Sequence, residues 1–265
     1  MVFADLLLAR RLERAEASAC ARFAEARRRI SPESGAAWME CAGAYAVFDT
    51  VDSPVTQCFG LGMFAPVTPA ALNEVERFFR DRGAQVDLEV SPLAGVAALD
   101  LLCSRGYRPI EVSSVLYQPV IPQSCPGNVR AMSPSEAGLW SQVSARGWAA
   151  DHPELENFLL DFGALLATRE GSVCFLAEAE GVPGAAGALS LHEGVALFAG
   201  ASTIRELRRR GLQAALLQAR MHYAAEQGCD LAMMVAEAGS GSQRNAERQG
   251  FRIAYTRTKW RLKDN

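Results

Sequence analysis

The residues best suited to chemistry in this chain stand just before a predicted helix. Four arginines precede a glycine, namely Arg205, Arg208, Arg209 and Arg210, then Gly211. Positive charge is unfavourable at the N-terminal end of a helix, because the helix dipole favours negative charge there. Free backbone N–H groups at such an end bind anions, and a glycine lets the ligand come close to the backbone. The pattern therefore predicts an anion site, and the alternative is a solvated arginine cluster.

The helix that would carry this site is predicted over residues 205–228. Its apolar positions recur at three- and four-residue steps, and they are Leu212, Ala215, Leu216, Ala219 and Tyr223. Gly228 is a natural stop for the helix. A strand predicted over residues 195–203 leads into the arginines, so the anion site would lie between the end of a strand and the start of a helix.

Two motifs in this part of the chain resemble the GNAT N-acetyltransferase superfamily. The first, Arg208-x-x-Gly211-x-Gln213-Ala214, is similar to the family's loop for the pyrophosphate of acyl-CoA, although Gln213 stands where the family has a second small residue. The second, at residues 245–251, resembles the family's corner between a helix and a strand. The two motifs occur in the family's order and at its spacing.

The resemblance implies contacts with acetyl-CoA in three places. The loop amides would hold the pyrophosphate, the end of the preceding strand would pair with the pantetheine arm, and an asparagine would contact the same arm. The residues assigned in this way are Ala201, Ser202, Thr203, Arg208, Arg209, Arg210, Gly211, Leu212, Gln213, Ala214 and Asn245.

The acid and base that acyl transfer to an amine requires are less clearly marked. Many family members carry a tyrosine four residues before the corner glycine, as a proton donor to the thiolate, and that position is Ala246. The catalytic candidates are Glu237, as a base beside a glycine–serine loop, and Tyr255 on the last predicted strand. The alternatives are a solvated carboxylate at a strand end for Glu237 and core packing for Tyr255.

Four other residues are candidates by type alone. Tyr223 and Glu154 could replace the missing acid or base, while His152 and Trp148 could line the acceptor pocket. Capping or packing is the alternative role for His152 and Trp148.

Composition limits the class of protein. The chain has 265 residues, 49% of them hydrophobic, and a net charge of −3, which argues against nucleic acid or a membrane surface as a general partner. The apolar run at the N-terminus is too short to predict a secretory or membrane-spanning segment. Seven cysteines without a Cys-x-x-Cys pair favour free thiols and a cytoplasmic location. Three scattered histidines lack metal-ligand spacing, so we expect no metal site.

An internal repeat predicts two domains. Residues 105–108 match residues 249–252, and each match follows a helix and precedes a strand. We therefore expect an α/β fold of two GNAT-like domains, each a mixed, mainly antiparallel sheet flanked by helices. The first, residues 1–120, would be degenerate, and the second, residues 127–265, would bind acetyl-CoA. The alternative is a coincidental match.

The first predicted domain lacks the anion-binding pattern. Residues 66–71 take the place of the Arg-x-x-Gly loop and contain neither an arginine cluster nor a glycine. The sequence thus predicts an N-acetyltransferase that transfers an acetyl group from acetyl-CoA to a primary amine of a small molecule or peptide. The alternative is a non-catalytic acyl-CoA-binding or regulatory protein, because the usual tyrosine is missing.

Overall fold

The computed structural model describes residues 3–149 and 156–263. The described residues form two compact units. Unit 1 comprises those within Met1–Tyr117, Val235–Glu247 and Phe251–Asn265, and unit 2 comprises those within Gln118–Met234 and Arg248–Gly250.

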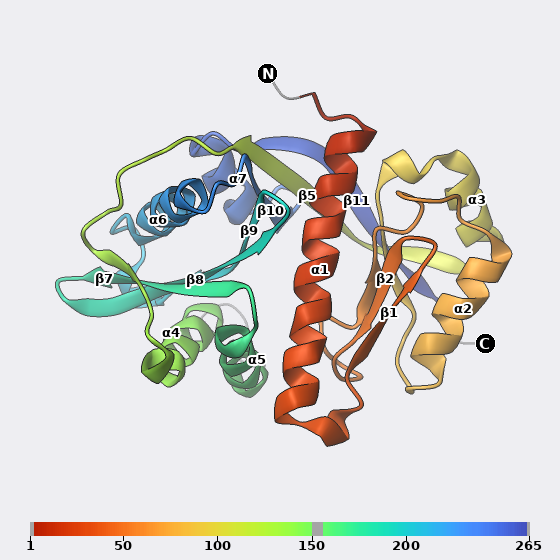
Figure 1. The fold of residues 1–265 in the computed structure, drawn as a ribbon, viewed down its shortest axis with the longest axis horizontal. Helices are drawn as coiled ribbons and strands as arrows, with labels where there is room; N and C mark the ends of the chain where they lie inside the picture. The colour runs from red at the N-terminus through yellow and green to blue at the C-terminus, as the bar shows by residue number, and fades with distance from the viewer. Residues whose placement is uncertain (1–2, 150–155, 264–265) are drawn as a thin grey trace. The chain divides into compact units, whose positions relative to one another are not determined.

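Unit 1 is a mixed sheet with helices on both faces (Figure 1). Its strands in spatial order are β1 (Ala37–Cys41), β2 (Ala44–Phe48), β3 (Gln57–Phe59), β4 (Asp87–Val90), β11 (Arg252–Leu262) and β5 (Tyr107–Pro119). Neighbouring strands are antiparallel, except that β3 and β4 are parallel. Its helices are α1 (Leu6–Ile30), α2 (Pro69–Arg80), α3 (Val96–Ser104) and α7 (Gly241–Arg248).

The two faces of the unit 1 sheet differ in character. Leu88 and Val90 of β4 pack with α2 in an apolar core. The intervening Glu89 points to the other face, where it pairs with Arg257 of β11, which also pairs with Glu13 of α1. The period-two alternation of a strand thus separates an apolar core from a charged layer.

Unit 2 has the same kind of layered arrangement. Its strands in spatial order are β6 (Val129–Ala131), β7 (Ser172–Ala179), β8 (Val182–His192), β9 (Val195–Thr203) and β10 (Leu231–Glu237), antiparallel except for the parallel pair β9–β10. Its helices are α4 (Ala137–Ala149), α5 (Glu156–Thr168) and α6 (Leu212–Glu226). Figure 1 shows α6 on one face of β7–β9, with α4 and α5 on the other. The expected fold class, mixed and mainly antiparallel sheets flanked by helices, is confirmed.

The last strand, β11, belongs to unit 1, whereas the sequence assigned it to the second domain. The predicted division was residues 1–120 and 127–265, whereas β11 pairs on both edges with unit 1, against β4 and β5. Pairing of this kind joins residues more than a hundred positions apart, so the local pattern of the strand does not reveal it.

Two other elements differ from the predicted ones. The helix expected from residue 205 begins at Leu212, because residues 205–207 form a separate 3₁₀ turn and Gly211 is left-handed. Strand β1 was not predicted, since a two-residue turn with positive φ at Ala42 and Gly43 separates it from β2. Ser133 and Glu136 form a capping box ahead of α4.

The glycines of the two corner motifs have similar φ angles. Gly106 and Gly250 both have positive φ, at 87° and 95°. The strands that follow them, β5 and β11, pair with each other in antiparallel register, with Tyr107 opposite Leu262. The copies of the predicted repeat therefore share a positive φ at the corner glycine.

Candidate functional site

The N-terminus of α6 has no side-chain cap. Gly211 occupies the N-cap position with a φ of 78°, a left-handed conformation that glycine adopts at little cost. The first helical hydrogen bond runs from the N–H of Ala215 to the carbonyl of Gly211 at 3.0 Å, so the N–H groups of Leu212, Gln213 and Ala214 precede the helical ladder. A Cβ added to Gly211 would meet no atom within 4 Å. An anion can therefore approach these amides closely.

The three arginines of the predicted loop point in different directions. Arg209 and Arg210 are exposed, and Arg209 has a φ of 65°, which is uncommon for a residue with a side chain. Arg210 pairs with Glu180 at 3.1 Å on the surface. Arg208 instead is half-buried and donates to two backbone carbonyls, of Thr203 at 3.2 Å and of Gly147 at 3.1 Å.

The strand that leads into the loop separates from its parallel neighbour. The ladder between β9 and β10 ends at the pair Leu197–Met233, while β9 continues beside β8 as far as Thr203. A register shift in the β8–β9 ladder coincides with the positive φ of Gly200, as expected for a β-bulge. The end of β9, which includes the predicted residues 201–203, lies beyond the last β10 pair.

The remaining predicted site residues fall in unit 1. Glu237 is exposed at the end of β10, and its carbonyl accepts from the N–H of Ser240 at 3.1 Å. Asn245 is exposed on α7. Tyr255 is buried, and its hydroxyl donates to Glu13 at 2.8 Å. Burial and the adjacent Glu13 carboxyl raise the pKa of Tyr255 well above its usual value, so the hydroxyl is a poor acid in this place.

The candidates chosen by residue type are also partly described. Tyr223 is half-buried on α6 and contacts Phe175 edge to face, with 5.8 Å between ring centroids, which is a packing arrangement. Trp148 is 39% exposed at the end of α4. His152 and Glu154 lie outside the described residues. Within residues 3–149 and 156–263, no cluster of His, Cys, Asp and Glu could hold a metal ion, and no helix is long and apolar enough to cross a membrane.

Comparison with family models identifies one segment of the chain. Residues 139–251 match the model of the Acetyltransferase (GNAT) family. This segment is similar to the GNAT acetyltransferases. The match runs from within α4 to the second corner motif, and thus includes the Arg208–Gly211 loop. The match supports acyl transfer from acetyl-CoA as the general activity. A comparison with curated protein sequences gives no match.

Solved structures with the GNAT fold resemble the chain over most of its length. A GCN5-related N-acetyltransferase from Kribbella flavida has a TM-score of 0.64 and 18% identity, over 93% of this chain and 96% of that one. A GNAT-family protein from Novosphingobium aromaticivorans DSM 12444 has a TM-score of 0.55 and 16% identity, over 90% and 96%. A tandem GNAT protein from the clavulanic acid biosynthesis pathway has a TM-score of 0.56 and 12% identity, over 84% and 79%. At these identities the likeness concerns the fold alone.

The position at which the resemblance implies a GNAT tyrosine is buried in both halves. Ala246, four residues before Gly250, has 0% exposure, and Leu102, four residues before Gly106, also has 0%. Both are apolar. A proton donor at this position is therefore absent in either copy, in agreement with the sequence analysis.

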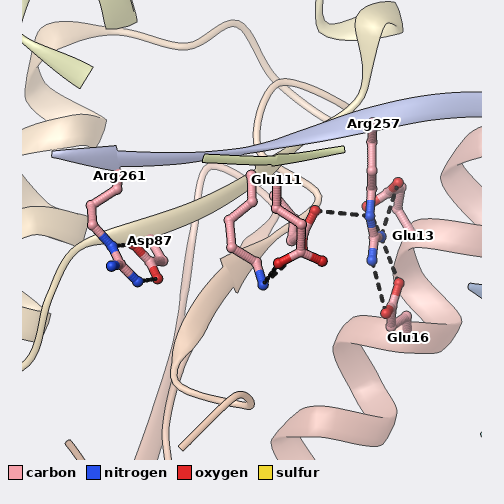
Figure 2. Close-up of polar contacts among 8 residues, drawn as sticks. Glu13, Glu16, Asp87, Glu111, Arg257 and Arg261 are labelled. Carbon is pink, nitrogen blue, oxygen red and sulfur yellow. Dashed lines mark hydrogen bonds and ion pairs between the residues drawn. The ribbon is translucent and has the colours of Figure 1, made fainter. Parts of the chain in front are cut away.

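A buried ionic cluster in unit 1 was not predicted (Figure 2). Arg257 pairs with Glu13 at 3.3 Å and Glu89 at 3.0 Å, and donates to Glu16 at 2.9 Å. Burial raises the pKa of Glu13 and of Glu89, and the charge of Arg257 opposes this shift. These carboxyls therefore hold protons more tightly than exposed ones.

The same face of β11 carries further ion pairs. Lys259 pairs with Glu111 at 2.8 Å, and Arg261 donates to both oxygens of Asp87 at 2.8 and 2.7 Å (Figure 2). The sequence signal was the placing of charged residues at every second position, 257, 259 and 261, which puts them on one side of a strand.

Unit 2 buries a charge in a different way. Arg220 of α6 is 1% exposed and donates to the carbonyls of Leu216 at 3.1 Å and Ala188 at 3.2 Å, with its guanidinium 4.9 Å from the ring centroid of Phe198. Burial lowers its pKa to about 9. No carboxylate of the described residues pairs with it, and no sequence pattern marked it.

Proposed function

We propose that the chain is an acetyl-CoA-dependent N-acetyltransferase, and that unit 2 binds acetyl-CoA. The observation that carries this proposal is the N-terminus of α6, where Gly211 leaves the amides of residues 209–214 without a side-chain cap. The pyrophosphate would accept hydrogen bonds from these amides, and Arg209 and Arg210 would add positive charge. The bound pyrophosphate would then offset the unfavourable positive charge of the arginines at the start of the helix.

The pantetheine arm would lie along the end of β9. Strand residues 201–203 have no β10 partner, so their backbone groups can pair with the amides of an extended ligand. This arrangement would direct the thioester toward the place where β9 and β10 separate. We assign Asn245 to the same arm on the resemblance alone.

Acyl transfer requires that the amine lose a proton and that the thiolate leave. Glu237 is our candidate for the base, acting directly or through a water molecule, because it is exposed at the end of β10. Tyr255 is the second catalytic candidate from the sequence, but its buried bond to Glu13 supports a packing role. The acceptor would be a primary amine of a small molecule or peptide.

An assay of free CoA release tests this function. We expect steady-state release of CoA from acetyl-CoA with at least one member of a panel of diamines, aminoglycosides, amino acids and peptide N-termini. The acetylated product should appear in equal amount by mass spectrometry. Release that does not depend on the amine would be hydrolysis and would contradict the proposal.

A non-catalytic acyl-CoA-binding or regulatory role is the second candidate. The fully buried Ala246, where the resemblance implies a tyrosine, favours it. Tight CoA binding by calorimetry without turnover on the whole panel would support this role over catalysis. Binding of neither CoA nor acetyl-CoA would exclude both.

A cytoplasmic location fits either role. All seven cysteines are free thiols, which is the usual state in a reducing compartment. The net charge of −3 supports neither nucleic acid nor a membrane surface as a partner.

A further inference from the structure

We propose that Arg208 is a positioning residue that fixes the end of β9 to the last turn of α4, and that it is not a ligand of the pyrophosphate. This inference rests on the proposed function, because it concerns the strand end assigned to the pantetheine arm. The sequence assigned Arg208 to the cofactor together with Arg209 and Arg210. The contacts of its guanidinium separate it from those two residues.

The first argument is that two N–H groups of its guanidinium already bind backbone carbonyls of the protein. The Nε of Arg208 donates to the carbonyl of Thr203, the last residue of β9, and its Nη2 donates to the carbonyl of Gly147 in the last turn of α4. The two carbonyls belong to different elements of unit 2, so one planar side chain bridges them. Arg209 and Arg210 are exposed instead, and Arg210 pairs with Glu180 at the surface, so both lie where a ligand can reach them.

The second argument concerns charge. The last carbonyls of a helix have no intrahelical partner, and the helix dipole favours a cation near them. Gly147 lies in that last turn of α4. The positive charge of Arg208 therefore has a favourable place at the C-terminal end of α4, without any phosphate.

The third argument is that other contacts hold the same two elements together. The hydroxyl of Ser202 donates to the carbonyl of Ser144 at 2.9 Å. Gly147 is packed so closely that a Cβ there would lie 2.7 Å from the Cβ of Ser202 and 2.9 Å from the nitrogen of Thr203. We call this set of five residues the α4–β9 clamp (Ser144, Gly147, Ser202, Thr203 and Arg208).

The clamp acts on the strand edge proposed to hold the acyl donor. If Arg208 is lost, the end of β9 can move relative to α4, and any thioester held along that edge is misplaced. The effect does not depend on whether the donor carries a pyrophosphate. A ligand of the pyrophosphate, by contrast, matters only for donors that contain one.

Two acyl donors separate these roles, namely acetyl-CoA and S-acetylpantetheine, which lacks the pyrophosphate and the nucleotide. We expect Arg208→Gln to lower kcat/KM about tenfold for both donors, which leaves their ratio near that of the wild type. The matched variant Arg209→Gln should lower the ratio of kcat/KM for acetyl-CoA to kcat/KM for S-acetylpantetheine. A ratio lowered by Arg208→Gln as much as by Arg209→Gln would overturn the inference.

A second measurement is independent of catalysis. In the ligand-free protein, amide hydrogen exchange in residues 144–149 should be faster in Arg208→Gln than in wild type, and unchanged in Arg209→Gln. Equal exchange in all three proteins would overturn the clamp, even if the chain proves to have no transferase activity. If Arg208→Gln does not fold, Ser202→Ala removes another hydrogen bond of the clamp. This variant should lower kcat/KM for both donors by the same factor. A loss of kcat/KM confined to acetyl-CoA would count against the clamp.

Discussion

Two helices, α2 in unit 1 and α6 in unit 2, begin in opposite ways. The N-cap of α2 is Thr68, in an extended conformation with φ of −117°, and its hydroxyl accepts from the N–H of Ala71 at 3.2 Å. Pro69 follows and has no N–H to satisfy. The N-cap of α6 is Gly211, left-handed and without a side chain. The chain thus satisfies one helix start by itself and leaves the other available to a ligand.

The strands before these helices show a second difference. The ladder of β3 and β4 consists of the single pair Cys58–Leu88. Beyond it, Gly62 packs against the chain itself, since a Cβ there would lie 2.6 Å from the Cβ of Ala94 and 3.1 Å from Val67. Unit 1 therefore fills with its own residues the space after its parallel pair. This supports the proposal that the first half is degenerate as a cofactor site.

The largest expected effect comes from Gly211→Glu. A carboxylate would face the proposed phosphate site, where like charges cost several kcal/mol, so CoA affinity should fall by more than about a hundredfold. The matched control is Thr68→Glu at the N-cap of α2, which should leave CoA affinity unchanged. Calorimetry with CoA checks both variants. Normal binding by Gly211→Glu would refute the anion site.

Stoichiometry tests the same comparison without a substitution. One CoA should bind per chain, because Thr68 caps the start of α2 in unit 1, whereas Gly211 leaves the start of α6 without a side-chain cap. Calorimetry that gives two CoA molecules per chain would show that unit 1 retains a site. Residual binding of one CoA to Gly211→Glu would locate that site outside the α6 loop.

Much of this comparison could be predicted from the sequence, and some could not. Residue types marked the open glycine at 211, because helix ends are local signals. The sequence did not predict that β11 pairs within unit 1, since strand pairing over long separations leaves no local pattern. The direction of the Arg208 side chain was also missed, because composition cannot tell whether a guanidinium meets a phosphate or two carbonyls.

Glu237→Gln should reduce turnover without changing CoA affinity. Glu237 stands 13 residues before Gly250, and Leu93 stands 13 residues before Gly106, so the two halves differ in chemistry at this position. Loss of a general base lowers kcat by about a hundredfold or more. The matched control, Leu93→Gln, should leave kcat unchanged. Equal kcat in Glu237→Gln and wild type would remove Glu237 from the mechanism.

The units also differ in how they bury an arginine, which predicts a pH effect. Arg257 lies among three carboxylates, whereas Arg220 has only carbonyl and ring partners. Because the pKa of Glu13 is raised in the folded state, its contribution to stability is complete below its unfolded pKa and is lost as pH rises through the folded pKa.

The free energy of unfolding should therefore fall between about pH 5 and about pH 8, and fall less in Glu13→Gln. Urea unfolding at both pH values measures the two slopes. Arg220→Met, which removes the buried charge of unit 2 without adding a titratable group, is the control and should keep the wild-type slope. Parallel curves for wild type and Glu13→Gln would show that Glu13 does not hold the proton.

The smallest expected effects come from the two N-caps themselves. Thr68→Ala removes the hydrogen bond to the N–H of Ala71, which costs about 1 kcal/mol of stability. Gly211→Ala places a side chain at a φ of 78°, which costs about 1 kcal/mol although the new Cβ meets no neighbour. The two variants should thus unfold at similar urea concentrations.

Added CoA separates the two N-cap variants, because a ligand that binds only the folded state stabilises it according to its affinity. Saturating CoA should raise the free energy of unfolding of Thr68→Ala as much as that of wild type. It should raise that of Gly211→Ala less, because the new methyl group enters the proposed phosphate site. A smaller gain in Thr68→Ala as well would show that the start of α2 takes part in binding, and that the two helix starts are not different in function.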